Sequence, residues 1–409
     1  MSKTILSAAV AVILAAGALT ASPSWAGEAK NTASKAANKQ LKASSDAMNA
    51  KNWNECVAKA KEALAAEGRT AYDAFLSNQL MGFCFVKQGN TAEAAIAYEA
   101  QLQSGFLPPD QQTQITKGVM QIAYQQKDYP KAVDLGNRLI KGGGADTDVY
   151  TVVGQSLYLQ KKYSETAKFM ADYVSDQEKR GQQPKEQSLM LLQDSYSKAG
   201  NSSGAADALE KMVMYYPKKE YWKTLMYSLR RIQGMNDRQT LQVYRLMVAN
   251  GTMEEPTDYS EMAELAVAGG NPAEAQKVLE AGIAANVFVE QRDKDRANRM
   301  LESVKKSAAT DLANLPKLEK EVAGAKTGDV QAALGNAYLS FGRNQEAADA
   351  LAAALAKGGL KSAADVQLTQ GVALVRAGNK GEALKAFKAV KTDDMIYSRI
   401  AKLWSLYVQ

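Results

Sequence analysis

The chain contains 409 residues, of which 46% are hydrophobic and 23% charged, and 50 Lys and Arg against 44 Asp and Glu give it a formal charge of +6. Basic residues are interspersed with acidic ones rather than clustered, which argues against nucleic-acid binding. Because the sequence has no histidine and two cysteines, it cannot contain a Ser-His-Asp or Cys-His catalytic arrangement or a cysteine-only zinc site. We therefore predict no catalytic site, metal or cofactor, although an enzyme that uses carboxylates alone, as many glycosidases do, stays compatible with this composition.

The first element is an apolar segment at the N-terminus. Lys3 precedes an uncharged apolar run over 5–19, and Ser24 and Ala26 then supply small residues at both specificity positions of a signal-peptidase site. An uncleaved membrane anchor is the alternative, but the run is short for a span. We predict cleavage after Ala26 and a periplasmic mature chain without a transmembrane span. No cysteine follows the run closely, so no lipoprotein site is expected.

Small side chains then recur at a spacing that indicates paired helices. One series falls in the second helix of each expected pair: Cys56, Ala94, Ala132, Thr166, Ala205, Ala275, Ala347 and Ala383. Twelve residues earlier lies a mostly small series: Ser44, Gly82, Met120, Gly154, Gln193, Ala263, Gly335 and Gly371. Turn glycines lie five residues before the Ala (Gly89, Gly200, Gly270, Gly342 and Gly378), and bulky residues four after it (Tyr98, Leu209, Leu279, Leu351 and Phe387). Antiparallel helices approach closely only where a small residue faces the partner and a bulky one fills the space beside it.

Two segments depart from this pattern. One helix pair, whose second helix spans about 237–249, lacks the small residue and is interpreted as a degenerate repeat. Residues 289–326 are highly charged and contain Pro316, and 72 residues separate Ala275 from Ala347. A diverged helix pair fits this gap, and a long solvated helix is the alternative. The predicted organisation is a signal peptide over 1–26, an N-terminal solenoid over 27–288, the charged segment over 289–326, and C-terminal repeats with a capping helix over 327–409.

The two cysteines lie on neighbouring helices of adjacent repeats. Export would permit a disulfide between them, and the spacing makes one geometrically possible. However, Cys56 occupies a slot that is Ala in other repeats, and Cys84 occupies one that is Ser or Ala. Both are explained as small buried residues, so we favour two free thiols and leave the disulfide open.

The repeat, clearest in Leu334-Gly335-Asn336-Ala337-Tyr338, resembles the tetratricopeptide repeat (TPR), a helix pair of about 34 residues. This resemblance implies an all-α solenoid: a right-handed superhelix of about nine or ten antiparallel helix pairs, without a sheet. The apolar residues of 397–408 follow a helical period, which predicts a capping helix that shields the last repeat. Solenoids of this kind are usually binding surfaces rather than catalysts.

In TPR proteins, inward-facing positions of the first helices line a concave surface. Carrying these positions over gives the candidate partner-binding residues: Phe83, Val86, Gln121, Tyr124, Gln155, Tyr158, Lys223, Tyr227 and Arg230. Amides and phenols combine hydrogen bonding with apolar area, which suits recognition of a peptide backbone. The alternative is that they merely form the solvated side of the helices. The TPR grip on a C-terminal carboxylate is disfavoured, because Lys117 is followed by Gln121 where that grip needs Asn.

A closer resemblance concerns Tyr216-Pro217-Lys218-Lys219-Glu220-Tyr221-Trp222 and Ala356-Lys357-Gly358-Gly359-Leu360-Lys361. Both segments resemble those of proteobacterial periplasmic TPR proteins, some of which are associated with TonB-type energy-transducing systems. The resemblance implies an exported scaffold that binds a protein or peptide in the cell envelope, accessory to a TonB-type complex. The alternative is an envelope-assembly or polysaccharide-export TPR module, a class that is often lipid-anchored. Neither the residues nor the resemblance identifies the partner or the oligomeric state.

Overall fold

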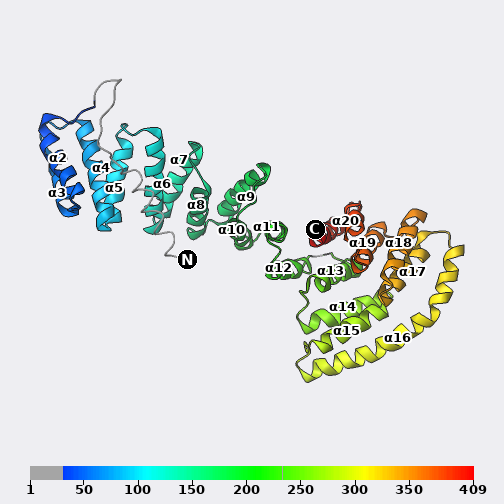
Figure 1. Cartoon of the computed structure of the whole chain (residues 1–409). Helices are drawn as coiled ribbons and strands as arrows, with labels where there is room; N and C mark the ends of the chain where they lie inside the picture. The colour runs from blue at the N-terminus through cyan, green and yellow to red at the C-terminus, as the bar shows by residue number, and fades with distance from the viewer. Residues whose placement is uncertain (1–30, 233) are drawn as a thin grey trace. The chain divides into compact units, whose positions relative to one another are not determined.

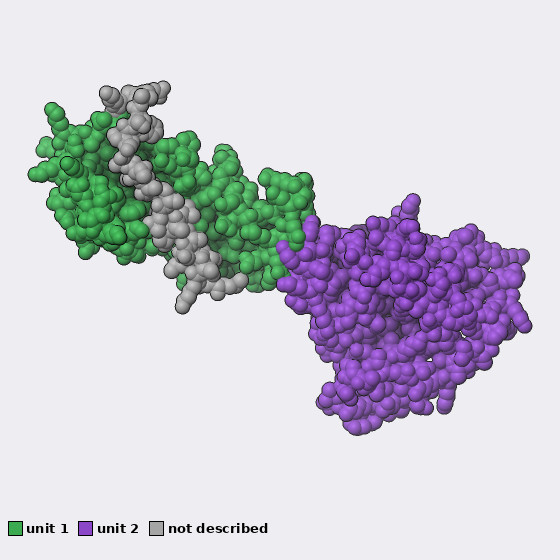
Figure 2. Space-filling model, viewed as in Figure 1, with its two compact units in different colours: residues 1–205 green, residues 206–409 purple. Residues whose placement is uncertain are grey.

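The structure, a computed structural model, describes residues 31–232 and 234–409 and builds them from twenty α-helices without a β-strand (Figure 1). The predicted signal peptide over 1–26 lies outside these residues. The chain divides into two compact units, residues 1–205 and 206–409 (Figure 2). The prediction of an all-α helical repeat solenoid is confirmed, because antiparallel helix pairs follow one another along the chain.

Unit 1 consists of helix pairs in which each helix packs against the next. Its helices are α2 (Lys35–Asn49), α3 (Trp53–Ala65), α4 (Ala71–Gln88), α5 (Thr91–Gln103), α6 (Pro109–Gln125), α7 (Tyr129–Lys141), α8 (Thr147–Leu159), α9 (Tyr163–Lys179) and α10 (Glu186–Lys198). The boundary between the units falls inside α11 (Ser202–Tyr215).

Unit 2 continues with further pairs, one unusually long helix and a terminal helix. Its helices are α12 (Lys219–Leu229), α13 (Asp237–Asn250), α14 (Pro256–Ala268), α15 (Pro272–Ala284), α16 (Gln291–Gly324), α17 (Gly328–Phe341), α18 (Asn344–Lys357), α19 (Ala363–Arg376), α20 (Lys380–Lys388) and α21 (Met395–Val408). In the described part of the chain, no helix combines the length and apolarity that crossing a membrane requires.

In the pairs that begin with α4, α8, α17 and α19, close approach depends on a glycine that faces a bulky side chain sixteen residues later. A Cβ added at Gly82 would lie 2.7 Å from the Tyr98 ring, and one added at Gly335 would lie 2.6 Å from Leu351. Atoms in a close-packed interior do not approach this closely, so a side chain at either glycine would push the helices apart. The predicted register is confirmed, and its second-helix series from Cys56 to Ala383 is buried throughout.

In the α6/α7 pair the large and the small residue have exchanged places. Met120 occupies the slot that is glycine in α4, α8, α17 and α19, and Gly136 stands where most other pairs carry the bulky side chain. A Cβ on Gly136 would lie 3.3 Å from the Met120 sulfur and 2.2 Å from Val153. The same volume is therefore filled from the opposite helix, which explains why Met120 interrupts the small series.

The turns between paired helices require a left-handed backbone. The five predicted turn glycines adopt φ between 74° and 83°. In the three remaining pairs of unit 1 the same slot is a lysine: Lys51, Lys127 and Lys161 have φ of 57°, 64° and 61°. Left-handed backbone costs a residue with a Cβ about 1–2 kcal/mol, so these three turns carry strain that the glycine turns avoid.

The segment over 289–326 forms one helix rather than the expected diverged pair. α16 runs without interruption from Gln291 to Gly324, through Pro316. Its buried residues are Ala297, Leu301, Val304, Ala308 and Leu315, a spacing of three, four or seven that keeps a single apolar stripe. α16 packs against α15 and also contacts α17. The apolar stripe of this single helix therefore takes the place of the diverged helix pair that was expected between them.

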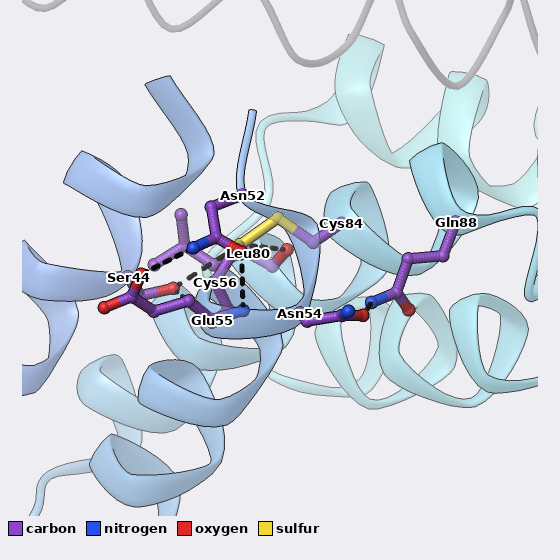
Figure 3. The surroundings of a disulfide bond; sticks show 8 residues. All are labelled: Ser44, Asn52, Asn54, Glu55, Cys56, Leu80, Cys84 and Gln88. Atoms are coloured by element: carbon purple, nitrogen blue, oxygen red, sulfur yellow. Dashed lines mark hydrogen bonds between the residues drawn. A yellow bond between two sulfur atoms is a disulfide. The ribbon is translucent and has the colours of Figure 1, made fainter. Parts of the chain in front are cut away.

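The interpretation of the cysteines as free thiols was wrong. Cys56 of α3 and Cys84 of α4 form a disulfide, with Cα atoms 6.4 Å apart (Figure 3). Both residues are fully buried, as their slots predicted, and Ser44 donates a hydrogen bond to the Cys56 carbonyl oxygen at 2.8 Å. Small residues bring α3 and α4 close enough for their sulfur atoms to meet, so the packing that explained two small residues also permits the bond.

In unit 2, a helix near the beginning of the unit packs against helices near its end. α13 packs against α19 and α21, and Figure 1 shows α19 beside it. Gln242 donates to Asp365 at 3.0 Å and to Thr369 at 2.8 Å, and the Tyr407 hydroxyl donates to the Ala249 carbonyl at 2.6 Å. The predicted capping helix α21 therefore packs on α20 and also joins the end of unit 2 to α13.

A buried ion cluster lies where α13, α15 and α19 meet. Glu274 accepts hydrogen bonds from Arg245 and Arg376, each at 2.7 Å, and the Arg245 and Glu274 side chains are 2% and 4% exposed. Burial by itself would raise the pKa of Glu274, but the two guanidinium groups outweigh it and lower the pKa to about 2. The carboxylate stays ionised and joins three helices.

Candidate functional site

In unit 1 the first helices lie on the inner side of the stack. α2 contacts α4, α6 contacts α8, and α8 contacts α10, whereas in the described part of this unit α3, α5 and α7 contact only first helices. Elements that touch one another follow the shorter, inner path of a curved stack. The first helices therefore form its concave side, where the candidate residues of unit 1 were expected.

Tyr124 and Tyr158 make equivalent contacts in successive repeats. The Tyr124 hydroxyl donates to Gln155 Oε1 on the next first helix at 2.9 Å. The Tyr158 hydroxyl donates to Asp194, again on the next first helix. Both residues are half-buried. The phenols thus form a line along the first helices and keep part of each ring accessible.

Each of these tyrosines also contacts an aromatic residue that begins its own second helix. The Tyr124 ring lies 5.9 Å from Tyr129, and the Tyr158 ring lies 5.3 Å from Tyr163. These second contacts fix the ring positions from the other side. The two repeats therefore hold their rings in matching surroundings.

A lysine adds charge beside Tyr158. Lys198 donates to the Tyr158 hydroxyl, and its ammonium lies 4.6 Å from the ring centre and 3.3 Å from Asp194. The hydrogen bond to Asp194 raises the pKa of Tyr158, with Lys198 opposing it, so the phenol stays protonated at neutral pH. The sequence-based set missed Asp194, although it follows Gln193 of the register as Gln155 follows Gly154.

The other candidates of unit 1 differ in accessibility. Phe83 is half-buried, lies 6.2 Å from Trp53, and has the Lys87 ammonium 5.4 Å above its ring. Val86 is 7% exposed and belongs to the core. Gln121 is half-buried, in the position equivalent to Gln155. Accessible candidates therefore lie on α4, α6 and α8, but among the described residues contacts between successive first helices run from α6 through α8 to α10 and not from α4 to α6.

In unit 2, Tyr227 and Arg230 are engaged within the fold. The Tyr227 hydroxyl donates to Asp258 at 2.7 Å, and Arg230 pairs with Asp258 and with Glu261, the latter at 2.7 Å. Asp258 is fully buried. Burial and the bond to Asp258 raise the pKa of Tyr227. These residues join α12 to α14, and the nearby Lys223 is paired with Glu254 at 2.6 Å.

Residues outside the predicted set form a cavity of mixed polar and apolar lining in unit 2. The cavity measures about 590 Å³ and is lined by residues of α13, α16, α17 and α19, among them Arg238, Gln242, Asn314 and Asn336. No group of three His, Cys, Asp or Glu side chains that could hold a metal ion occurs within 31–232 and 234–409.

The comparisons with known proteins concern the repeats. Residues 332–395, covering most of α17 through α20, match the tetratricopeptide repeat family. A search of curated proteins finds no match. TPR repeats bind protein or peptide partners, so the repeats of this chain indicate a protein-interaction scaffold.

Solved structures with similar helical repeats include a tetratricopeptide repeat protein from Parabacteroides merdae ATCC 43184, at 10% identity and a TM-score of 0.31, over 81% of this chain and 98% of that one. Naa15/Naa10 bound to HypK-THB is similar at 15% identity and a TM-score of 0.28, over 87% and 64%. The TPR2AB domain of yeast Sti1 in complex with pHSP90 is similar at 10% identity and a TM-score of 0.25, over 72% and 98%. Similarities this low carry no argument about the partner.

Proposed function

We propose that this chain is an exported interaction scaffold that binds an extended protein segment along the first helices of unit 1. The repeated tyrosine contacts carry the proposal: Tyr124 and Tyr158 hold half-buried rings in equivalent places one repeat apart. Packed helices lie about 8–10 Å apart, so a few extended residues can touch both rings. Rigid aromatic side chains supply contact area at low entropic cost.

The polar groups between the rings give this surface its chemistry. Gln155 accepts the Tyr124 hydroxyl through Oε1, so what it offers beside the phenols is its amide NH2 group, which can donate to a peptide carbonyl. Asp194 and Lys198 add one charge of each sign at the α10 end. The partner segment should therefore be mixed in polarity rather than strongly acidic or basic.

The corresponding residues of unit 2 favour unit 1 as the binding surface. The Arg230 side chain is only 18% exposed and already forms ion pairs with Asp258 and Glu261. The Asp258 carboxylate is fully buried. A partner could engage Arg230 only by displacing these ion pairs, which would leave Asp258 buried without its countercharge. Tyr124 and Tyr158 need no such rearrangement.

We further propose that the scaffold acts in the periplasm, accessory to a TonB-type complex. The apolar run followed by Ser24 and Ala26 supports export. The disulfide between Cys56 and Cys84 adds support, because disulfides persist in oxidising compartments such as the periplasm. The TonB association rests only on the resemblance carried by residues 216–222 and 356–361.

The binding surface is tested with Tyr124→Ala/Tyr158→Ala. Helicity should be unchanged, and partner recovery from envelope extracts after mild crosslinking should fall about ten-fold, since interface aromatics often contribute more than about 1 kcal/mol each. Ile96→Ala is the matched control, because Ile96 is 62% exposed on the second helix α5. Recovery of partners at wild-type yield by the double variant would contradict the proposed surface.

Location and partner are tested by fractionation and crosslinking. The periplasmic fraction should contain a chain whose N-terminal sequence begins at Gly27; retention of the full chain in the cytoplasm would contradict export. The crosslinked partner should be a component of an energy-transducing complex. Recovery of an outer-membrane barrel or a glycan instead would favour the envelope-assembly alternative.

A further inference from the structure

The cavity of mixed lining in unit 2 has two walls formed by helices that do not touch each other. One wall consists of the start of α13 and the segment that leads into α19, and α13 packs against α19. The other wall is α16, which in the described part of the chain contacts α14, α15 and α17 but neither α13 nor α19. α17 contacts both α16 and α19 and links the two walls. A ligand that spans the cavity therefore meets different groups at its two ends.

The two walls carry accessible charges of opposite sign. Arg238 and Lys361 line the α13/α19 wall and are exposed, and Asp311 lines the α16 wall and is half-buried. Within residues 31–232 and 234–409, none of these three side chains takes part in an ion pair or a hydrogen bond. Asp237 precedes Arg238, but adjacent residues of a helix do not face each other, and a carboxylate there favours the N-terminus of α13. The two cations and Asp311 therefore stay available to a ligand.

The other charged groups of the cavity are engaged within the fold. Arg245 is bonded to Glu274, and its side chain is only 2% exposed. Burial lowers the pKa of Arg245, but Glu274 and Asp365 outweigh it and raise the pKa above its ordinary value. Asp329 accepts a hydrogen bond from the Lys361 backbone N–H at 3.0 Å, which leaves the Lys361 ammonium unpaired. Arg245, Asp365 and Asp329 are therefore not counted as ligand contacts.

The balance of charge around the cavity favours a ligand without net negative charge. Four carboxylates and three cationic side chains line it, and the bonded pair of Glu274 and Arg376 behind Arg245 leaves this difference of one unchanged. A zwitterion adds no net charge and supplies an ammonium group to Asp311. Its ammonium should accordingly be the stronger anchor and its carboxylate the weaker one.

Amide and apolar side chains supply the remaining contacts. Asn314 of α16 is exposed and Asn336 of α17 is half-buried, and neither side chain is hydrogen-bonded to another described residue. A side-chain amide offers an NH2 donor and a carbonyl acceptor, which complement the two groups of a peptide unit. The half-buried Leu265 and Leu318 add apolar surface for a small side chain.

We propose that this cavity binds a short zwitterionic peptide, with its N-terminal ammonium at Asp311 and its C-terminal carboxylate at Arg238 and Lys361. The cavity volume of about 590 Å³ lies within the range of about 300–1,000 Å³ that small-molecule sites occupy. Each extended residue adds about 3.3–3.6 Å of reach, so two or three residues can join the walls, whereas a single amino acid keeps both charges close together. The site uses none of the residues proposed to bind the protein partner, so either proposal can fail without the other.

The first experiment is isothermal titration of the purified chain with trialanine and with the same peptide blocked at either end. Acetylation of the N-terminus should weaken binding about ten-fold and amidation of the C-terminus about three-fold, because each removes one charge-assisted contact and the cavity favours the ammonium. Alanine should bind more weakly than trialanine. No binding of trialanine, or equal affinity for the acetylated peptide, would overturn the proposal. Tighter binding of spermidine than of trialanine would replace the zwitterion with a polycation.

Variants then assign each end of the peptide to its wall. Asp311→Asn should weaken trialanine about ten-fold and leave the acetylated peptide unchanged, because that peptide has no ammonium to lose. Arg238→Gln/Lys361→Gln should weaken trialanine about three-fold and leave the amidated peptide unchanged. Glu302→Gln and Lys306→Gln are the matched charge controls, since both residues are exposed on α16 outside the cavity, and neither should alter binding.

Thermal melting of each variant shows whether it folds, and the blocked peptides test the parent chain independently of any variant. If Asp311→Asn melts like the parent yet binds trialanine with parental affinity, the ammonium lies elsewhere and the assignment fails. The assignment also fails if Asp311→Asn weakens the free and the acetylated peptide equally, since Asp311 then does not recognise the ammonium.

Discussion

Unit 1 and unit 2 use the same packing between paired helices but differ in what holds the unit together. The inter-repeat links of unit 1 join neighbours, and its disulfide spans a sequence separation of 28. Unit 2 adds bonds between distant segments: Arg376 to Glu274 across 102 residues and Lys402 to Glu210 across 192. Unit 1 is therefore a stack in which the links join adjacent repeats. In unit 2, ion pairs and side-chain amide hydrogen bonds also join helices that are far apart in the sequence.

This difference predicts different unfolding behaviour. In an open stack each repeat contacts only its neighbours, so local opening can start at an end and spread. In unit 2, α13 is held by α19 and α21 as well as by its neighbours, so opening one link exposes several helices together. Hydrogen exchange, which reports on each unit separately, should show graded protection in unit 1 and more uniform protection in unit 2.

The largest effect should come from Glu274→Gln, which leaves Arg245 buried without its countercharge. Breaking a buried pair from one side costs about 3–5 kcal/mol, so the free energy of unfolding of unit 2 should fall by that amount while unit 1 is unchanged. Glu280→Gln is the control, since Glu280 is exposed and 3.9 Å from Lys305. If Glu274→Gln and Glu280→Gln showed equal protection from hydrogen exchange in unit 2, the ion cluster around Glu274 would not be what stabilises that unit.

The same group predicts a pH dependence. The two guanidinium groups, outweighing burial, lower the pKa of Glu274 from 4.5 to about 2. A lowered folded-state pKa stabilises the fold above the unfolded value, and this stability is lost as pH falls from about 4.5 through about 2. Urea unfolding of the parent and Glu274→Gln should therefore converge near about pH 2, and a constant difference between them down to that pH would contradict the assignment.

The next effect concerns unit 1. Replacing both cysteines, as Cys56→Ala/Cys84→Ala, should lower the stability of unit 1 by about 2–4 kcal/mol, because the unfolded chain regains the freedom of the closed loop. Chemical reduction of the parent should give the same loss. Protection in unit 2 should not change in either case. If reduction loosens both units equally, their stabilities are coupled and the comparison between them fails.

Ala347→Leu tests the packing that both units share. Ala347 is fully buried, and its carbonyl oxygen would lie 3.3 Å from a Cβ added at Gly335. Added volume at such a contact should lower stability by about 1–3 kcal/mol through overpacking, measured as a lower melting temperature. Asp349→Leu, on the exposed side of α18, provides the control. An unchanged melting temperature for Ala347→Leu would mean that the interface tolerates extra volume.

The smallest effect should be stabilising. Lys127→Gly removes the strain of a left-handed lysine and should raise the stability of unit 1 by about 0.5–1 kcal/mol after the entropy of the unfolded chain is counted. The reciprocal control is Gly89→Ala, where an added Cβ meets nothing within 4 Å and only the backbone angle opposes it. That variant should lose about 1 kcal/mol, and a loss on Lys127→Gly would show that the lysine side chain contributes contacts of its own.

The sequence predicted the elements and their local packing well, because both depend on nearby residues. The slots of Gly335 and Ala347 could be assigned since a repeat fixes which faces of two adjacent helices meet. Met120 departed from the series of small first-helix residues because the compensating small residue, Gly136, lies on the second helix. The positions of the first helix alone do not show that the large and the small side chain have exchanged helices. The disulfide was missed because Cys56 and Cys84 fit their slots equally well as reduced or oxidised residues.

The candidate site was predictable only in part. Tyr124 and Tyr158 follow from the repeat register, and the hydrogen bonds they make to the next repeat agree with it. Tyr227 and Arg230 were chosen by the same register, but Asp258 engages both, and a register cannot show which polar residues pair internally. Asp194 could have been included, since it occupies the Gln155 position of the following repeat.

By itself, the sequence determined that this chain forms stacked helix pairs, where the turns fall and which small residues face bulky ones, because each of these depends on residues within one repeat. Tertiary structure alone decided that α16 is one helix, that two sulfur atoms meet, and that Glu274 draws Arg245 and Arg376 together to close unit 2. Glu274 lies 29 positions from Arg245 and 102 positions from Arg376 in the sequence. Contacts at that distance depend on the summed geometry of every intervening helix, which no repeat pattern records.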